Sequence, residues 1–232
     1  MDRMEFLIYK NDLIAVFLVV ALLFSYRVFL RRVSRRDSLA VLSNAASLAR
    51  NAWVETVMAN HADAILAIQT LRNSTMAASF LASTAILLMV GALTLTGQAK
   101  SLQATWHFLN IFGTLAPELW LVKLLVILLL LFYAFFSFTN SIRINNHVGY
   151  MVSLKQDDGL KLFSPRMVAS QLNLGSDYFR AGIRAYYYLV PLVFWLFGPA
   201  YMVASTLILV FVFLPKIDLT PRQFRQAEQD NQ

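Results

Sequence analysis

Four long stretches with almost no charge constrain the fold of this chain more than any other feature. They cover about residues 12–30, 75–96, 118–139 and 186–214. A helix needs about 20 residues to cross the hydrocarbon core of a bilayer, and its backbone hydrogen bonds must close within the segment. The sequence therefore predicts an all-α integral membrane protein: a single membrane domain over residues 1–232 with four transmembrane helices.

The composition agrees with this fold class. Of the 232 residues, 58% are hydrophobic and only 14% are charged, which is too apolar for a soluble domain. The first apolar stretch follows a mixed acidic and basic segment, so we expect a retained anchor rather than a cleavable signal. Because the chain has no cysteine, disulfides, a thiolate nucleophile and cysteine-ligated metals are excluded.

The basic residues predict how the stretches are oriented. Six arginines follow the first stretch and six basic residues follow the third, but only Lys100 separates the second from the third. Basic loops stay on the cytoplasmic side, so we expect a multi-pass protein of the bacterial cytoplasmic (inner) membrane with both termini outside. Lys216, Arg222 and Arg225 in the tail fit this orientation poorly. The chain has a formal charge of +7, and its arginines lie beside the apolar stretches. The expected anionic partner is therefore phospholipid and not nucleic acid.

Long cytoplasmic helical extensions are expected at about residues 38–74 and 140–185. No glycine or proline occurs before Gly91, so one helix from Ser38 to Leu95 is predicted, with Arg72 at the membrane boundary. An apolar stripe on it needs cover, which favours a homo-oligomer; it comprises Leu39, Leu42, Ala46, Ala49, Trp53 and Val57. Pro117 is expected to begin the third membrane helix. Ser164 is expected to cap a helix that begins at Pro165 and stops at Gly175.

Arginines surrounded by amides and hydroxyls form the first candidate site. Guanidinium groups with amide donors suit a phosphate headgroup or a small anion. The alternative is that these arginines only extend to lipid phosphates and set the topology. The candidate residues are Arg72, Arg143, Gln69, Asn73, Asn140 and Arg184.

Helical phase groups further polar residues. Arg50, His61 and Arg72 are spaced by eleven residues, and Asn140, Arg143 and His147 share one side of the third helix. Such stripes form either a polar seam between packed helices or, in a ring of subunits, a cytoplasmic vestibule lined by Arg50, His61 and His147. We expect no metal site, because His61, Asp63 and His147 lie at unsuitable depths and phases.

The last apolar stretch contains Pro191, Gly198 and Pro199. Each proline removes a helix hydrogen bond, which gives either a fixed kink or a hinge for gating. Lys123 is the single ionisable residue well inside a predicted span, and no acidic residue lies near the midplane. This pattern disfavours an ion-coupled transporter.

Three segments carry a resemblance to a known family. They are "RNAWVETVMANHADAILAIQTLRNSTMAASFLASTAILL", "FFSFTNSIRINNHVGY" and "RAGIRAYYYLVPLVFWLFGPAYM". Together they resemble the DUF599 family of small membrane proteins. The resemblance implies a multi-span membrane protein and supplies no catalytic residues.

Two hypotheses for function follow. The first is a homo-oligomeric pore or transport-like assembly with a basic, polar cytoplasmic vestibule. The alternative is a non-conducting scaffold or accessory subunit that binds anionic lipid or another membrane protein. The sequence carries no nucleophile elbow or phosphate loop, so we expect no enzyme and no cofactor.

Overall fold

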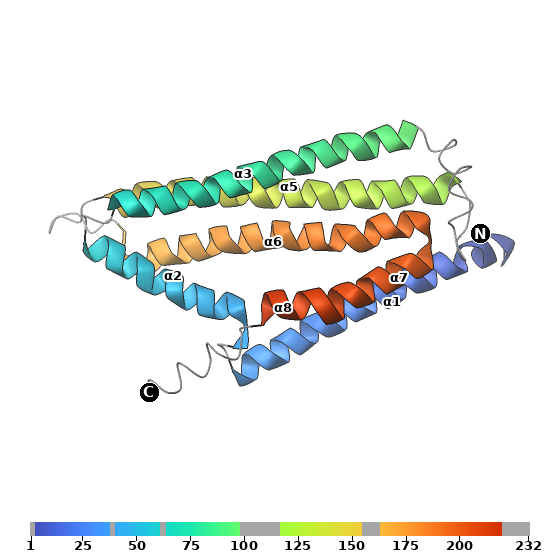
Figure 1. Ribbon diagram of the computed structural model, residues 1–232, viewed down its shortest axis with the longest axis horizontal. Coiled ribbons are helices and arrows are strands. Elements are labelled where there is room, and N and C mark those ends of the chain that lie inside the picture. Colours follow the sequence, from blue (N-terminus) through green and yellow to red (C-terminus); the bar gives the residue numbers. More distant parts are fainter. Residues whose placement is uncertain (1–2, 38–39, 61–63, 98–116, 155–162, 220–232) are drawn as a thin grey trace. The chain divides into compact units, whose positions relative to one another are not determined.

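In the computed structural model, residues 3–37, 40–60, 64–97, 117–154 and 163–219 are described (Figure 1). Almost all of this part of the chain is helical, which confirms the all-α prediction. Its elements are α1 (Arg3–Arg36), α2 (Leu42–Ala59), α3 (Ala64–Gly97), α5 (Pro117–Ser153), α6 (Pro165–Phe197), α7 (Pro199–Ile208), the π-helical turn η4 (Leu209–Phe213) and α8 (Leu214–Asp218).

Four helical segments within these ranges are long and apolar enough to cross a membrane, as expected for an integral membrane protein. They are Lys10–Arg36, Ala64–Gly97, Glu118–Ser153 and Pro199–Asp218. The first three contain the predicted stretches. The fourth begins later than predicted, at the start of α7.

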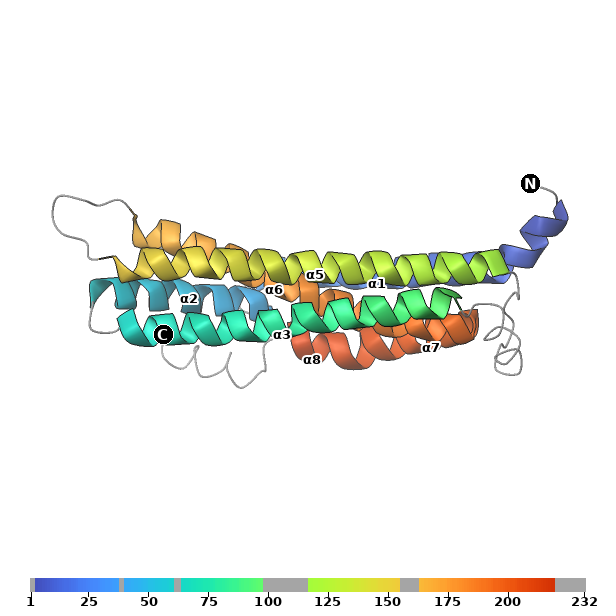
Figure 2. The same ribbon diagram turned by 90° about the horizontal axis from the view of Figure 1, so that it is seen from above.

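The chain divides into two compact units. Unit 1 comprises Met1–Asn44, Met89–Leu130 and Tyr186–Gln232, and unit 2 comprises Ala45–Leu88 and Leu131–Ala185. Helices α3, α5 and α6 each contribute one part to both units; Figure 2 shows α5 as one uninterrupted helix.

The predicted single helix from Ser38 to Leu95 is wrong. Helix α2 ends at Ala59 and α3 begins at Ala64, so α2 is a separate helix. Its residues Val54 and Val57 lie in one buried cluster with Ala67 and Leu71 of α3. Burying this apolar face within unit 2 outweighs the continuous helical preference of the sequence, although no glycine or proline marks the break.

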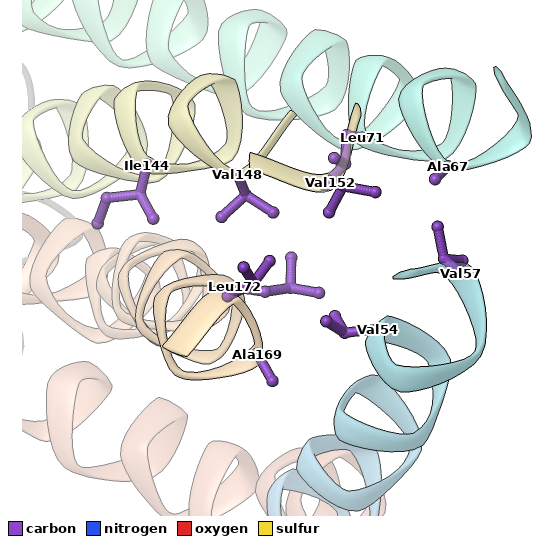
Figure 3. Packing of buried hydrophobic residues seen from close by; sticks show 10 residues of the cluster. Val54, Val57, Ala67, Leu71, Ile144, Val148, Val152, Ala169 and Leu172 are labelled. Atoms are coloured by element: carbon purple, nitrogen blue, oxygen red, sulfur yellow. The ribbon is translucent and has the colours of Figure 1, made fainter. Parts of the chain in front are cut away.

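The core of unit 2 joins all four of its helices. Figure 3 shows ten buried apolar side chains from α2, α3, α5 and α6 in contact. The predicted start of α6 is confirmed, because it begins at Pro165 and the Met167 N–H donates to Ser164 Oγ over 3.3 Å.

Glycines let α5 and α6 approach closely in this unit, and the predicted helix stop at Gly175 is wrong. A Cβ atom on Gly175 would lie 2.8 Å from Asn145 Oδ1, and one on Gly182 would lie 2.6 Å from Phe138 Cε1. The missing side chains therefore serve close packing, and α6 continues to Phe197.

In unit 1, α6 and α7 form an antiparallel hairpin, so the single last span predicted over residues 186–214 is also wrong. Gly198 joins the helices with a φ of 146°, which favours glycine, and Pro199 is the first residue of α7. Trp195 packs near Met202, whereas Tyr187 and Tyr188 pack near Leu214. Pro191 lies inside α6 without ending it.

Helices α1 and α7 run in the same direction (Figure 1). Ala15 and Val19 of α1 share a cluster with Met202 near the start of α7. Further along, Tyr26 packs with Leu214, and its hydroxyl donates to Asp218 Oδ2 over 3.1 Å. Successive residues of α1 thus contact successive residues of α7 and of the segment that follows it, as expected for parallel helices.

A buried ion pair ties α1 and α5 to the end of α6. Lys123 Nζ lies 3.0 Å from Asp12 Oδ1, and the two side chains are only 4% and 3% exposed. Trp195 Nε1 donates to the same carboxylate over 2.7 Å. Lys123 Nζ also donates to the Trp195 carbonyl over 3.1 Å. Pro199 has no N–H to offer that carbonyl, so Lys123 and the Gly198 N–H complete the end of α6.

Removal of one residue of the Asp12–Lys123 ion pair should lower the stability of the protein. Lys123→Met leaves the Asp12 carboxylate buried without its cation and is expected to destabilise the protein by about 3–5 kcal/mol. The double variant Asp12→Leu, Lys123→Met should recover most of that loss. Thermal unfolding in detergent measures both, with Lys216→Met on the exposed surface as the control. Equal stability of Lys123→Met and the control would contradict the pairing.

Glycine substitutions test the close packing of α5 and α6. Gly182→Ala places a methyl group against the fully buried Phe138 ring, and we expect a loss of about 1–3 kcal/mol. Gly91→Ala meets no atom within 4 Å, so it should leave the stability unchanged or raise it slightly. Unfolding midpoints in the same detergent compare the pair, and the prediction fails if the two variants behave alike.

Candidate anion-binding cavity

The main candidate site is an open cavity of about 790 Å³ in unit 2, named here the Arg50 cavity. Its lining comes from α2, α3, α5 and α6, so it exists only because α2 packs on the other three helices. Polar side chains from all four helices face it: Arg50, Thr70, Asn73, Ser74, Ser141, Asn145, Ser176 and Arg180.

Two arginines are the charged residues among those that line the cavity. Arg50 of α2 donates from Nε to Asn173 Oδ1 over 2.8 Å. Asn173 in turn donates from Nδ2 to Asn51 Oδ1 over 2.8 Å. Arg180 of α6 pairs through Nη2 with Asp177. One guanidinium is therefore held by an amide and the other by a carboxylate.

The electrostatics of the cavity favour an anion. Burial lowers the pKa of the Arg50 guanidinium, the positive charge of Arg180 lowers it further, and Asp177 partly opposes this shift. Arginine remains protonated at physiological pH. The shift therefore reports an unfavourable environment for the charge on Arg50, which an anion between the two guanidinium groups would improve.

Three residues that line the cavity each carry a buried polar atom without a partner. Within the described part of the chain, Ser141 Oγ, Asn145 Oδ1 and Arg180 Nε have no hydrogen bond. Ser141 is completely buried, and Asn145 is 6% exposed. Buried polar groups are nearly always paired, so such a set indicates a place for a polar ligand or water. Arg180 Nε and the Ser141 hydroxyl can donate, whereas Asn145 Oδ1 accepts.

The rest of the wall is apolar. Trp53, Leu71, Leu172 and Phe179 line the same cavity, and Leu71 and Leu172 are buried. A cavity with guanidinium groups and an apolar wall matches a molecule that carries both an anionic group and hydrocarbon.

The candidate residues from the sequence lie in different places. Arg50 and Asn73 line the Arg50 cavity. Arg72, the next residue, faces elsewhere: it lines a separate groove of about 600 Å³ between α3 and α5 with Asn146 and Tyr150. This groove is named the Arg72 groove. Successive helix residues point about 100° apart, which separates Arg72 from Asn73.

The remaining predicted residues line neither of these two hollows. Gln69, Arg143 and His147 are exposed, and Arg184 is half-buried. Asn140 donates from Nδ2 to the Phe136 carbonyl of its own helix over 3.0 Å. His61 lies outside the described residues. Gly198 and Pro199 form the α6–α7 turn.

Sequence reasoning missed the contribution of α6. Asn173, Ser176, Asp177 and Arg180 recur at steps of three and four, which is the spacing of one helix face. The expected stop at Gly175 hid this pattern. Within the described ranges, no group of three or more His, Asp or Glu residues is arranged to hold a metal ion.

Comparison with curated proteins and with solved structures found no match. A family model described as "Protein of unknown function, DUF599" matches residues 14–222, which cover most of the chain. This match includes the three segments that carried the resemblance and all helices that form the Arg50 cavity. The chain therefore belongs to the DUF599 family.

Proposed function

We propose that this membrane protein binds an anionic phospholipid, with the headgroup phosphate between Arg50 and Arg180. The observation that carries the proposal is the Arg50 cavity itself: two arginines, three residues with an unpaired buried polar atom, and apolar residues all line one hollow. A free phosphate would satisfy the guanidinium groups but leave the apolar wall without contacts.

The position of the cavity along α3 supports a lipid. Thr70, Asn73 and Ser74 line the cavity just before the long uncharged stretch of α3 begins, and Ala77 lies inside that stretch. Headgroups occupy this boundary between water and hydrocarbon. Under the positive-inside bias this is the cytoplasmic boundary, so the ligand belongs to the inner leaflet.

This proposal develops the alternative reading of the sequence, a scaffold or accessory protein that binds anionic lipid. The homo-oligomeric pore stays a prediction, with less support than before. It relied on neighbouring subunits to cover the apolar stripe of α2, yet Val57 is buried and Trp53 is half-buried in the core of the same chain. A partner membrane protein also remains a prediction.

We also propose a new orientation: the amino terminus outside and the carboxyl terminus in the cytoplasm. Because α1 and α7 are parallel, a chain that crosses the membrane with both must cross an odd number of times. The carboxyl-terminal part of α6, which is antiparallel to α7 and uncharged from residue 186 to 197, belongs to the additional crossing in this proposal. Lys216, Arg222 and Arg225 then face the cytoplasm with the other basic segments, which removes the poor fit of the tail.

Charge removal in the cavity tests lipid binding. In Arg50→Gln and Arg180→Gln, affinity for phosphatidylglycerol should fall at least tenfold, which corresponds to about 1.4 kcal/mol. Native mass spectrometry of the detergent-solubilised chain measures bound lipid, with Arg143→Gln as a control of equal charge change on an exposed helix face.

Two further binding measurements distinguish a phospholipid headgroup from a free phosphate ion. Inorganic phosphate should compete weakly, and zwitterionic phosphatidylcholine should bind more weakly than phosphatidylglycerol. Equal loss in Arg143→Gln would show a surface charge effect and would overturn the proposal. Full displacement by inorganic phosphate would assign the cavity to a free anion instead.

The accessibility of introduced cysteines tests the orientation. A cysteine placed after Gln232 in this naturally cysteine-free chain should resist a membrane-impermeant thiol reagent in intact cells and react after permeabilisation. A cysteine placed after Met1 should react in intact cells. Two reactive termini in intact cells would restore the even number of crossings predicted from the sequence.

A further inference from the structure

We infer that Asn173 sets the charge specificity of the Arg50 cavity, so that the site takes a monoanionic phosphodiester headgroup. The inference rests on the proposed lipid binding and names the class of lipid. Asn173 acts on the ligand through Arg50, so it is a positioning residue.

The two arginines of the cavity differ in what holds them. Arg180 pairs with the carboxylate of Asp177, which compensates its charge. Arg50 Nε instead donates to the neutral amide oxygen of Asn173 over 2.8 Å. An amide fixes the direction of a guanidinium group without compensating its charge. Arg50 therefore has an amide rather than a carboxylate as its hydrogen-bond partner, and the more distant Asp177 is the carboxylate that acts on its charge.

A second amide determines how Asn173 is oriented. Asn173 Nδ2 donates to Asn51 Oδ1 over 2.8 Å, so the Asn173 oxygen is turned toward Arg50. The two asparagines bridge α2 and α6, and both are half-buried. If Asn173 turned its nitrogen toward Arg50, two donors would face each other and the contact would be lost.

The charges around the cavity leave one positive charge uncompensated. Arg50 and Arg180 line the cavity, and Asp177 pairs with Arg180. Asn173 also lines a smaller hollow of about 340 Å³ together with Glu55 and Arg166, which carry one charge of each sign. A phosphodiester with one negative charge matches this balance.

The remaining polar atoms suit the substituent of such a phosphodiester. Ser141 Oγ and Arg180 Nε are buried donors without an acceptor among the described residues, whereas Asn145 Oδ1, which packs against Gly175, is a buried acceptor without a donor. A headgroup with a hydroxyl substituent supplies that donor, as phosphatidylglycerol does. A phosphomonoester such as phosphatidic acid has no such substituent and carries up to one more negative charge.

The experiment converts the neutral acceptor into a charged one. Asn173→Asp retains an oxygen acceptor for Arg50 but compensates its charge, so affinity for phosphatidylglycerol should fall at least tenfold. Affinity for phosphatidylcholine should change less than threefold, because that headgroup carries no net charge. Asn146→Asp, an exposed position in the Arg72 groove, makes the same charge change as a matched control and should leave both affinities within threefold.

A second variant tests the orientation of the amide. Asn51→Leu removes the acceptor that fixes Asn173 and should weaken phosphatidylglycerol binding two- to fivefold without a change in charge. In the wild type, phosphatidic acid should bind no more tightly than phosphatidylglycerol. Native mass spectrometry in lipid mixtures gives the ratio of affinities, and a purely structural role would weaken all lipids equally.

The outcomes separate this inference from the proposed function. Loss of binding in Arg50→Gln with wild-type selectivity in Asn173→Asp would overturn the role of Asn173 and leave lipid binding intact. No preference for phosphatidylglycerol over phosphatidylcholine in the wild type would overturn both. If Asn173→Asp does not fold, Asn51→Leu decides, and unchanged phosphatidylglycerol binding in that variant rejects the inference.

Discussion

The contact of α2 with α3, α5 and α6 is the interaction on which the candidate site depends. Val54 and Val57 bury the apolar face of α2 in the core of unit 2, and this places Arg50 beside Arg180. Without that packing, Arg50 would be an ordinary surface arginine and the walls of the cavity would be open. Burial of a small apolar face of α2, rather than a catalytic motif, therefore brings the polar residues of unit 2 around one cavity.

In unit 1, a buried polar cluster rather than an apolar face joins the helices. The carboxylate of Asp12 accepts from Trp195 Nε1 and pairs with Lys123, so three helices meet at one polar cluster. In an apolar environment such a cluster is stable only when every member is satisfied. Polar contacts thus fix the helix arrangement in unit 1, whereas in unit 2 Ser141 Oγ, Asn145 Oδ1 and Arg180 Nε have no hydrogen bond to the described residues.

Sequence reasoning succeeded where local chemistry decides and failed where tertiary packing decides. The apolar stretches and the helix starts at Pro117 and Pro165 follow from hydropathy and proline geometry. The break after Ala59 has no local signal, because it depends on burial of Val54 and Val57. Gly198 was recognised as a special position, but reversal rather than kinking depends on the packing of α7 against α6. In the site, Arg50 and Asn73 were predicted, whereas the expected stop at Gly175 hid the helix face that Asn173 shares with Arg180.

The ion pair also bears on how the protein is made. Asp12 belongs to α1, whereas Lys123 belongs to α5 and Trp195 lies 183 positions after Asp12, so the ribosome makes Asp12 before both of its partners. A lone carboxylate is costly in hydrocarbon and tolerable at the interface. The Asp12 end of α1 therefore lacks the partners of its carboxylate until α5 and α6 have been synthesised, so this polar cluster is completed late in translation.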